Sequence, residues 1–248
     1  EVGYVQSMNV VAALLLQLLD GDEPRAFWCF AALISQLPPR FYSRAPTALL
    51  GFWVEAELLV LLARDWLGLR NLRVALLQIA PKWLLEYFVG TLPLPTLVNA
   101  WGSTLAAATD DAARPPTLHL RIALALLQLR RQQLLDFDTD DPAQQHAAFE
   151  LLQSTQPCEV QGRWVLDKAL AIPLDATSVD EMRRRLRHAL SGGAAASRQR
   201  ALPPAIPPEA TPPAAPMLKG RNGWPERRSW RRAHVDLCAR LSDFLVLW

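Results

Sequence analysis

Residues 115–135 read PPTLHLRIALALLQLRRQQLL, and this stretch decides the fold class. Two prolines open it, and apolar residues then recur at the three- and four-residue spacing of one helix face: Leu118, Ile122, Leu126 and Leu129. Leu and Ala are strong helix formers, and the alternating β-branched residues of a strand are scarce. The stretch therefore predicts a strong amphipathic helix.

Segments of the same kind fill the rest of the first 155 residues, with short Pro, Gly or Asp breaks between them. Asp22 is a predicted N-cap with Pro24 in the first turn of its helix. Pro81 is expected to open a new helix in which Trp83 and Phe88 face inward. The predicted helices cover residues 7–19, 22–37, 47–66 and 69–79, then run from Pro81, around 97–105, from Pro115 and from Pro142. With no strand blocks between them, they predict an all-α, multi-helix bundle.

The chain after residue 155 differs from the first 155 residues in composition and in its predicted structure. Residues 156–176 are expected to be irregular, with Trp164 tucked onto the body, and Ser178 to Ser191 to form a helix that Ser178 caps with Glu181. The predicted organisation is a bundle domain over 1–155, peripheral helices and irregular segments over 156–200, a partly disordered Pro-rich linker over 201–225, and an amphipathic helix over 226–248. The apolar stripe of that last helix comprises Trp230, Leu237, Leu241, Phe244 and Trp248.

Charge also divides the chain. The net charge is +2, but residues 1–155 hold 11 Lys and Arg against 15 Asp and Glu, and the remainder holds 15 against 9. A basic extension on an acidic body could favour acidic partners or anionic lipid, although a solvated surface is the simpler interpretation. The basic clusters at 183–187 and 227–232 lack stacking aromatic residues interleaved at strand spacing, so no nucleic-acid partner is expected.

Several site classes find no support in the sequence. The three cysteines are far apart, the four histidines are isolated from one another, and no P-loop or dinucleotide fingerprint is present, so no metal or cofactor site is expected. Residues 2–19 are uncharged, but polar residues interrupt the run, which favours a buried helix over a membrane span. The acidic run at 136–141 is expected to be a solvated turn, and most tryptophans are expected in the core: Trp28, Trp53, Trp83 and Trp101.

Residues 3–9, GYVQSMN, resemble the Y-x-Q-G-M-N motif of TBC-domain Rab GTPase-activating proteins. Three later segments resemble that family in the same order: EPRAFWCFAALI at 23–34, KWLLEYFVGTLPLPTLVNAWG at 82–102, and the helix at 115–135. The resemblance covers about residues 1–153. It implies a TBC-type helical bundle of which this chain carries the C-terminal part, without the N-terminal lobe.

The resemblance also implies a mechanism in which an arginine and a glutamine enter the nucleotide site of the GTPase together. An arginine stabilises charge on the γ-phosphoryl group, and a glutamine amide orients the attacking water. By this similarity Gln6 is the catalytic glutamine, while Tyr4, Met8 and Asn9 support its loop. Such a protein regulates a GTPase rather than performing chemistry on its own substrate. The implied partner is a GTP-bound Rab-family GTPase, and the implied location is cytoplasmic, peripheral at endomembranes.

Three departures from the family pattern bear on activity. The arginine belongs to an I-x-x-D-x-x-R motif that is expected upstream of Glu1. Ser7 stands where the family has glycine, and Gly102 stands where it has aspartate after Trp101. A non-catalytic TBC-like scaffold that binds a GTPase or effector is therefore the alternative. A third hypothesis makes residues 230–248 a membrane-surface or partner-docking element.

Overall fold

The computed structural model describes residues 4–43, 49–107 and 117–198. In these ranges the chain forms α-helices and one π-helical segment, η1, and no β-strand, which confirms the predicted all-α fold. The predicted linker at 201–225 and the terminal helix at 226–248 lie outside the described residues. The elements are α1 (Met8–Leu18), α2 (Glu23–Ser35), α3 (Leu50–Leu67), α4 (Arg73–Ala80), η1 (Pro81–Leu85), α5 (Leu94–Ala107), α6 (Leu118–Leu129), α7 (Arg131–Asp136), α8 (Pro142–Gln153), α9 (Glu159–Ala171) and α10 (Ala176–Arg198).

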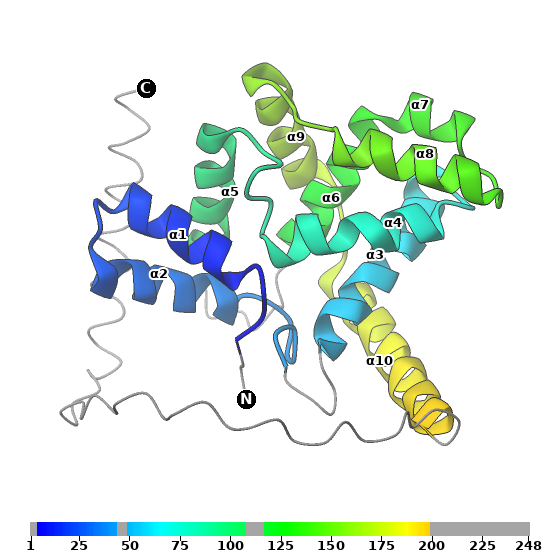
Figure 1. The fold of residues 1–248 in the computed structure, drawn as a ribbon, viewed down its shortest axis with the longest axis horizontal. Coiled ribbons are helices and arrows are strands. Elements are labelled where there is room, and N and C mark those ends of the chain that lie inside the picture. The colour runs from blue at the N-terminus through cyan, green and yellow to red at the C-terminus, as the bar shows by residue number, and fades with distance from the viewer. Residues whose placement is uncertain (1–3, 44–48, 108–116, 199–248) are drawn as a thin grey trace, which may run out of the picture.

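The helices form a hairpin and a larger body (Figure 1). α1 and α2 lie side by side as the hairpin, and α2 packs against α5. In the body, α6 lies in the middle and packs against α3 and α9, while α4 packs against α8. α10 packs along α3 and lies far from α1.

α6 is more deeply buried than its sequence pattern predicts. Eight of its twelve residues are buried, which leaves no broad solvent face. The prediction of a strong amphipathic helix was wrong because both α3 and α9 pack against α6, and a helix buried on most sides is apolar on most sides. The buried residues are His119, Leu120, Ile122, Ala123, Leu124, Ala125, Leu126 and Leu127.

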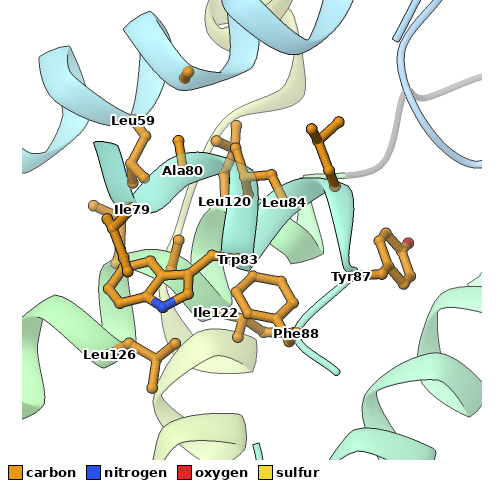
Figure 2. Packing of buried hydrophobic residues seen from close by; sticks show 14 of the residues in the cluster. Leu59, Ile79, Ala80, Trp83, Leu84, Tyr87, Phe88, Leu120, Ile122 and Leu126 are labelled. Carbon is orange, nitrogen blue, oxygen red and sulfur yellow. The ribbon is translucent and has the colours of Figure 1, made fainter. Parts of the chain in front are cut away.

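Trp83 fills the centre of the body from the π-helical segment (Figure 2). Its side chain is fully buried, and the backbone N–H of Phe88 donates to the Trp83 carbonyl over 2.9 Å, five residues back. Pro81 opens η1, as predicted, and its φ of −56° lets η1 follow α4 without a break. After η1, Tyr87 and Phe88 take positive φ values of 51° and 64°, and these end the helical backbone.

Gly51 allows close contact between α3 and residues 36–43, the segment that leaves α2, which is called the hairpin's exit segment below. A Cβ on Gly51 would lie 2.5 Å from the Phe41 nitrogen and 2.7 Å from the Pro39 carbonyl oxygen. The Gly51 N–H instead donates to the Arg40 carbonyl at 3.0 Å. The first turn of α3 is thereby joined to the segment that leaves α2.

The chain after residue 155 is more regular than predicted. Residues 159–171 form α9, whose Gly162 allows close packing against α5, because a Cβ there would lie 2.5 Å from Thr96 Oγ1. α10 starts at Ala176, and Asp175 rather than Ser178 caps it: the Ser178 N–H donates to Asp175 Oδ2 over 2.7 Å. The capping-box prediction was therefore wrong by one helical turn.

Two further sequence expectations need correction. Trp83 and Trp101 are buried as predicted, but the Trp53 side chain is 42% exposed because it lies on the outer side of α3. The acidic run is not merely solvated: both carboxylate oxygens of Asp138 accept backbone N–H groups, from Arg70 at 3.0 Å and Asn71 at 2.6 Å, just before α4. This carboxylate satisfies two backbone donors of the segment that leads into α4.

No helix within the described ranges is both long enough and apolar enough to cross a membrane. The same ranges contain no group of three or more His, Cys, Asp or Glu residues that could hold a metal ion.

Candidate functional site

The candidate site is the turn that leads into α1, and Gln6 is its exposed residue. The turn closes on itself: the Met8 N–H donates to the Val5 carbonyl at 3.1 Å, and the Val10 N–H donates to the Ser7 carbonyl at 3.1 Å. Across the described part of the chain, no side chain or backbone group forms a hydrogen bond or ion pair with the Gln6 side chain. The amide is thus presented to solvent from a backbone that is held in place.

Met8 and Asn9 contact this backbone from the first turn of α1. Met8 is buried, and its sulfur accepts a hydrogen bond from the Val5 N–H at 3.2 Å. Asn9 Oδ1 accepts from the Ser7 N–H at 3.2 Å. Tyr4 lies further out, with 68% of its surface exposed, and makes no comparable contact to the turn within the described residues. The functional roles of all four residues remain predictions.

Ser7 adopts a backbone conformation that favours glycine. Its φ is +92° and its ψ is −25°, in the left-handed region, and it is the N-cap of α1 without a side-chain capping bond. A non-glycine residue with this φ is strained, because its Cβ crowds the backbone. Ser7 therefore replaces the family's glycine at a position where glycine would adopt the same φ without strain.

The electrostatics of the turn favour a negative ligand. No acidic residue lies in the first turn of α1, so the positive end of the helix dipole is uncompensated there. Gln6 precedes this helix end directly. Its amide carries both a donor and an acceptor, so it can bind a water or a phosphoryl oxygen.

The second departure, Gly102, lies on α5 away from this turn. A Cβ built at Gly102 would meet nothing within 4 Å, and the residue is partly exposed. The neighbouring Trp101 is anchored by its own indole, whose Nε1–H donates to the Tyr87 carbonyl at 3.2 Å. The packing of Trp101 therefore does not depend on a side chain at position 102.

The sequence analysis missed a buried ionic network that joins α3, α6 and α10. Glu55 is fully buried, and its carboxylate accepts from Arg183 Nε at 2.6 Å and Nη2 at 2.9 Å. His119 Nε2 lies 2.7 Å from Glu55 Oε2, and Arg183 Nη1 donates to Asp180 at 3.0 Å. Burial by itself raises the pKa of Glu55, but the hydrogen bonds from Arg183 and His119 outweigh it and hold that pKa below its ordinary value.

A signal for this network was present in the sequence. Glu55 lies within the apolar run GFWVEAELLVLL, whose other acid is Glu57, and His119 stands in an equally apolar stretch. Ionisable residues on buried helix faces need partners, so each predicts a counterpart elsewhere in the chain. The counterpart, Arg183, was assigned to a solvated basic cluster, and that assignment was wrong because its side chain is 3% exposed.

Comparison with known proteins bears on the identity of this bundle. The profile of the Rab-GTPase-TBC domain matches residues 1–135. The chain is 30% identical to Carabin of Mus musculus over 135 residues, 52% of this chain and 29% of that protein. It is 27% identical to Growth hormone-regulated TBC protein 1-A of Danio rerio over 140 residues, 54% of this chain and 36% of that protein.

A third relative is TBC1 domain family member 2A of Mus musculus, 29% identical over 154 residues, 60% of this chain and 16% of that protein. The chain thus spans well under half the length of these relatives. No solved structure matches it. Since the profile covers more than half of the 248 residues, and includes both the α1 turn and α6, the chain belongs to the Rab-GTPase-TBC domain family.

Proposed function

We propose that the protein to which this chain belongs is a GTPase-activating protein for Rab-family small GTPases. The observation that carries the proposal is the exposed Gln6 amide, held on a closed turn at the start of α1 inside the region that matches the Rab-GTPase-TBC domain. The partner is the GTP-bound form of the GTPase. The protein acts as a regulator, and the phosphoryl transfer takes place in the nucleotide site of its partner.

In this proposal Gln6 orients the water that attacks the γ-phosphoryl group. Its amide offers a hydrogen-bond acceptor for the water and a donor for a phosphoryl oxygen. Phosphoryl transfer needs such positioning and charge stabilisation more than covalent help from protein groups. The second catalytic group, an arginine that stabilises the developing charge, is proposed to come from upstream of Glu1.

The alternative is a non-catalytic scaffold that binds a GTPase or an effector. It is favoured by Ser7, whose strained φ of +92° occupies the place of the family's glycine beside Gln6. A side chain there narrows the space that a docked nucleotide site has available. The two proposals differ in what Gln6 does, and not in whether a GTPase binds.

The test compares Gln6→Ala with Gln17→Ala in the longer protein that includes the upstream segment. Gln17 is an exposed glutamine of the same helix, α1, and serves as the matched control. Single-turnover GTP hydrolysis by a panel of Rab GTPases is measured together with binding of each GTPase in its GTP-bound form. We expect Gln6→Ala to lower the stimulated rate about 100-fold with binding unchanged, as when one transition-state donor is removed.

If both variants stimulate hydrolysis equally, Gln6 has no catalytic role. If neither the wild-type protein nor a variant stimulates hydrolysis, although GTP-bound GTPase is retained, the scaffold replaces the activator.

We further propose that the protein is cytoplasmic and peripheral at endomembranes, in contact through its basic tail. The support is the excess of Lys and Arg after residue 155. Flotation of the full chain with vesicles rich in phosphatidylserine tests this. Loss of flotation at high salt is expected, because the attraction is electrostatic, and flotation from neutral vesicles alone would contradict it.

A further inference from the structure

Within the described residues, the end of the hairpin that carries Gln6 has one charged side chain. Residues 4–19 contain no Asp, Glu, Lys, Arg or His, and residues 26–43 contain Arg40 alone. The acidic residues of the hairpin lie at its opposite end, in the turn between α1 and α2 and at the start of α2. Arg40 therefore sets the fixed charge of the hairpin and its exit segment around Gln6.

The hairpin geometry brings Arg40 beside the turn that carries Gln6 (Figure 1). α1 and α2 pack side by side across a short turn, so they run antiparallel, and the start of α1 lies next to the end of α2. Val11, one turn into α1, lines the same small hollow as Leu37 and Tyr42, which flank Arg40 in the exit segment. Packed helix axes lie about 8–10 Å apart, so Gln6 and Arg40 belong to one surface.

The backbone of Arg40 is held in place, while its guanidinium has no partner. Its carbonyl accepts the Gly51 N–H at 3.0 Å, and the next two residues, Phe41 and Tyr42, are buried. Arg40 itself is exposed, and across the described ranges its side chain forms no hydrogen bond or ion pair. A positive charge is thus presented to solvent from a fixed position.

The conformation of Arg40 is one that glycine would adopt without strain. Its φ is +65°, in the left-handed region. Residues held in such sparsely populated conformations cluster at functional sites, where the surrounding structure maintains them. Glycine at this position would give the same turn without the charge, so the strained arginine is further evidence that the guanidinium has a role.

A GTPase that receives Gln6 in its nucleotide site has to cover Arg40 as well. A specific interface buries about 800 Å² on each partner, which corresponds to a disc of roughly 16 Å radius. Centred on Gln6, such a disc extends across the neighbouring end of α2 into the exit segment. A charge covered in this way loses hydration, and an opposite charge on the partner has to compensate for that loss.

We propose that Arg40 pairs with a carboxylate on the surface of the GTP-bound GTPase, beside its nucleotide site, and so contributes to the choice of partner. The hairpin surface around Arg40 is otherwise uncharged, so a GTPase with an acid at the facing position is favoured over one with a base. The planar guanidinium can donate two parallel hydrogen bonds to a carboxylate. Arg40 acts on binding and not on the reacting atoms. The inference rests on the proposed function, because it assumes that the GTPase docks over Gln6.

The test measures how Arg40 variants of the longer protein, with its upstream segment, bind the panel of GTP-bound Rab GTPases. Arg40→Gly removes the guanidinium and keeps the left-handed φ without strain, Arg40→Lys keeps the charge, and Arg40→Glu reverses it. Arg70→Glu is the matched control for charge reversal. Arg70 is exposed in the connection between α3 and α4, on the side of the body remote from α1 (Figure 1).

For the GTPase that binds wild type most tightly, we expect Arg40→Gly to weaken binding about 10-fold and Arg40→Glu about 100-fold. Arg40→Lys should retain most of the affinity, and Arg70→Glu should change it less than about twofold. The losses should shrink in about 0.5 M NaCl, because salt screens the pair. The hydrolysis rate at saturating protein should stay unchanged, since a surface carboxylate takes no part in the reaction.

Three results would overturn the contact. The first is equal binding of wild type, Arg40→Gly and Arg40→Glu. The second is a lower saturating rate with unchanged binding, because Arg40 would then act on the nucleotide. The third is a lower urea midpoint for Arg40→Gly with unchanged binding, which would mean that the charge is paired within the protein.

Failure of this contact is distinguishable from failure of the proposed function. If GTPase binding depends on Arg40 but wild type does not stimulate hydrolysis, the activator is overturned and the contact stands. If hydrolysis depends on Gln6 while binding is indifferent to Arg40, the activator stands and the contact is overturned. If wild type binds no GTPase of the panel, both are overturned.

Discussion

The α1–α2 hairpin and the body around α6 are both helical and apolar, but they are covered to different extents. Eight of twelve residues are buried in α6, against three of eleven in α1. The body is also fixed by the Glu55 network, which joins three helices across sequence distances of 64 and 128 residues. Buried stabilising contacts are thus concentrated around α6 and the Glu55 network, and the candidate site lies outside them on the hairpin.

Breaking the Glu55 network should have the largest effect. Arg183→Met leaves a buried carboxylate with one partner fewer, and we expect a loss of about 3–5 kcal/mol in the free energy of unfolding. Arg184→Met is the control, since Arg184 is exposed and pairs with Glu181 on the surface, where ion pairs contribute less than about 1 kcal/mol. Urea unfolding at pH 7 measures both. Equal effects would mean that α10 is not held through Glu55.

The pH dependence of stability in wild type and Arg183→Met gives a second test of the Glu55 network. Because the pKa of Glu55 is held below its ordinary value, its contribution is complete above the unfolded pKa of about 4.3 and is lost as the pH falls through the folded value. The difference in the free energy of unfolding between wild type and Arg183→Met should therefore stay large above about pH 4.3 and shrink as the pH falls below that value. A constant difference would exclude an ionised Glu55.

Alanine substitutions at two glycines should have opposite effects on stability, because one glycine lies in the tight contact between α3 and the hairpin's exit segment and the other lies on the open surface of α5. At Gly51 a Cβ meets three backbone atoms within 2.7 Å, so Gly51→Ala should cost about 2–3 kcal/mol through forced displacement of the backbone. At Gly102 a Cβ meets none within 4 Å, and Gly102→Ala should stabilise the helix by about 0.5–1 kcal/mol. Urea midpoints that moved in the same direction would contradict this contrast.

Tyr42 is the polar link between the hairpin's exit segment and the body. Its hydroxyl donates to the Leu85 carbonyl at 2.9 Å, and Tyr42→Phe should cost about 1 kcal/mol by leaving that carbonyl unsatisfied. Tyr4→Phe, at a site 68% exposed, should change nothing measurable. Thermal unfolding at pH 8 compares the two.

Burial raises the pKa of Tyr42, and it raises the pKa of Tyr87 to about 12. Stability from these buried hydroxyls is complete below the unfolded pKa of about 10 and falls as the pH rises above it. The difference between wild type and Tyr42→Phe should therefore narrow from pH 9 to pH 11. A difference that widened would show that Tyr42 ionises in the folded protein.

The sequence predicted the helices well and the long-range contacts poorly. Asp22, Pro24 and Pro142 mark helix starts through local backbone chemistry, and the structure has helices there. The partnership of Glu55 with Arg183 depends on how α10 packs on α3, and no local pattern encodes it. For the same reason α6 was predicted as amphipathic, because its neighbours α3 and α9 lie far away in the sequence.

The candidate site shows the same division. The motif at residues 3–9 was found through its resemblance to a family, and its position before a helix follows from the apolar run after it. The left-handed conformation of Ser7 could be suspected from the family's glycine, but the Met8 and Asn9 contacts to the turn needed coordinates. Side-chain contacts within a turn depend on rotamers that a sequence pattern does not specify.

The smallest expected effect concerns Ser7 itself. Ser7→Gly relieves a left-handed strain of about 1–2 kcal/mol but adds unfolded-state entropy worth about 0.5–1 kcal/mol. The net gain should be about 0.5–1 kcal/mol in urea unfolding. Ala13→Gly on the exposed side of α1 is the opposite control, with a loss of about 1 kcal/mol. If Ser7→Gly destabilised the chain as Ala13→Gly does, Ser7 would not hold its positive φ in solution, and the turn that presents Gln6 would have another shape.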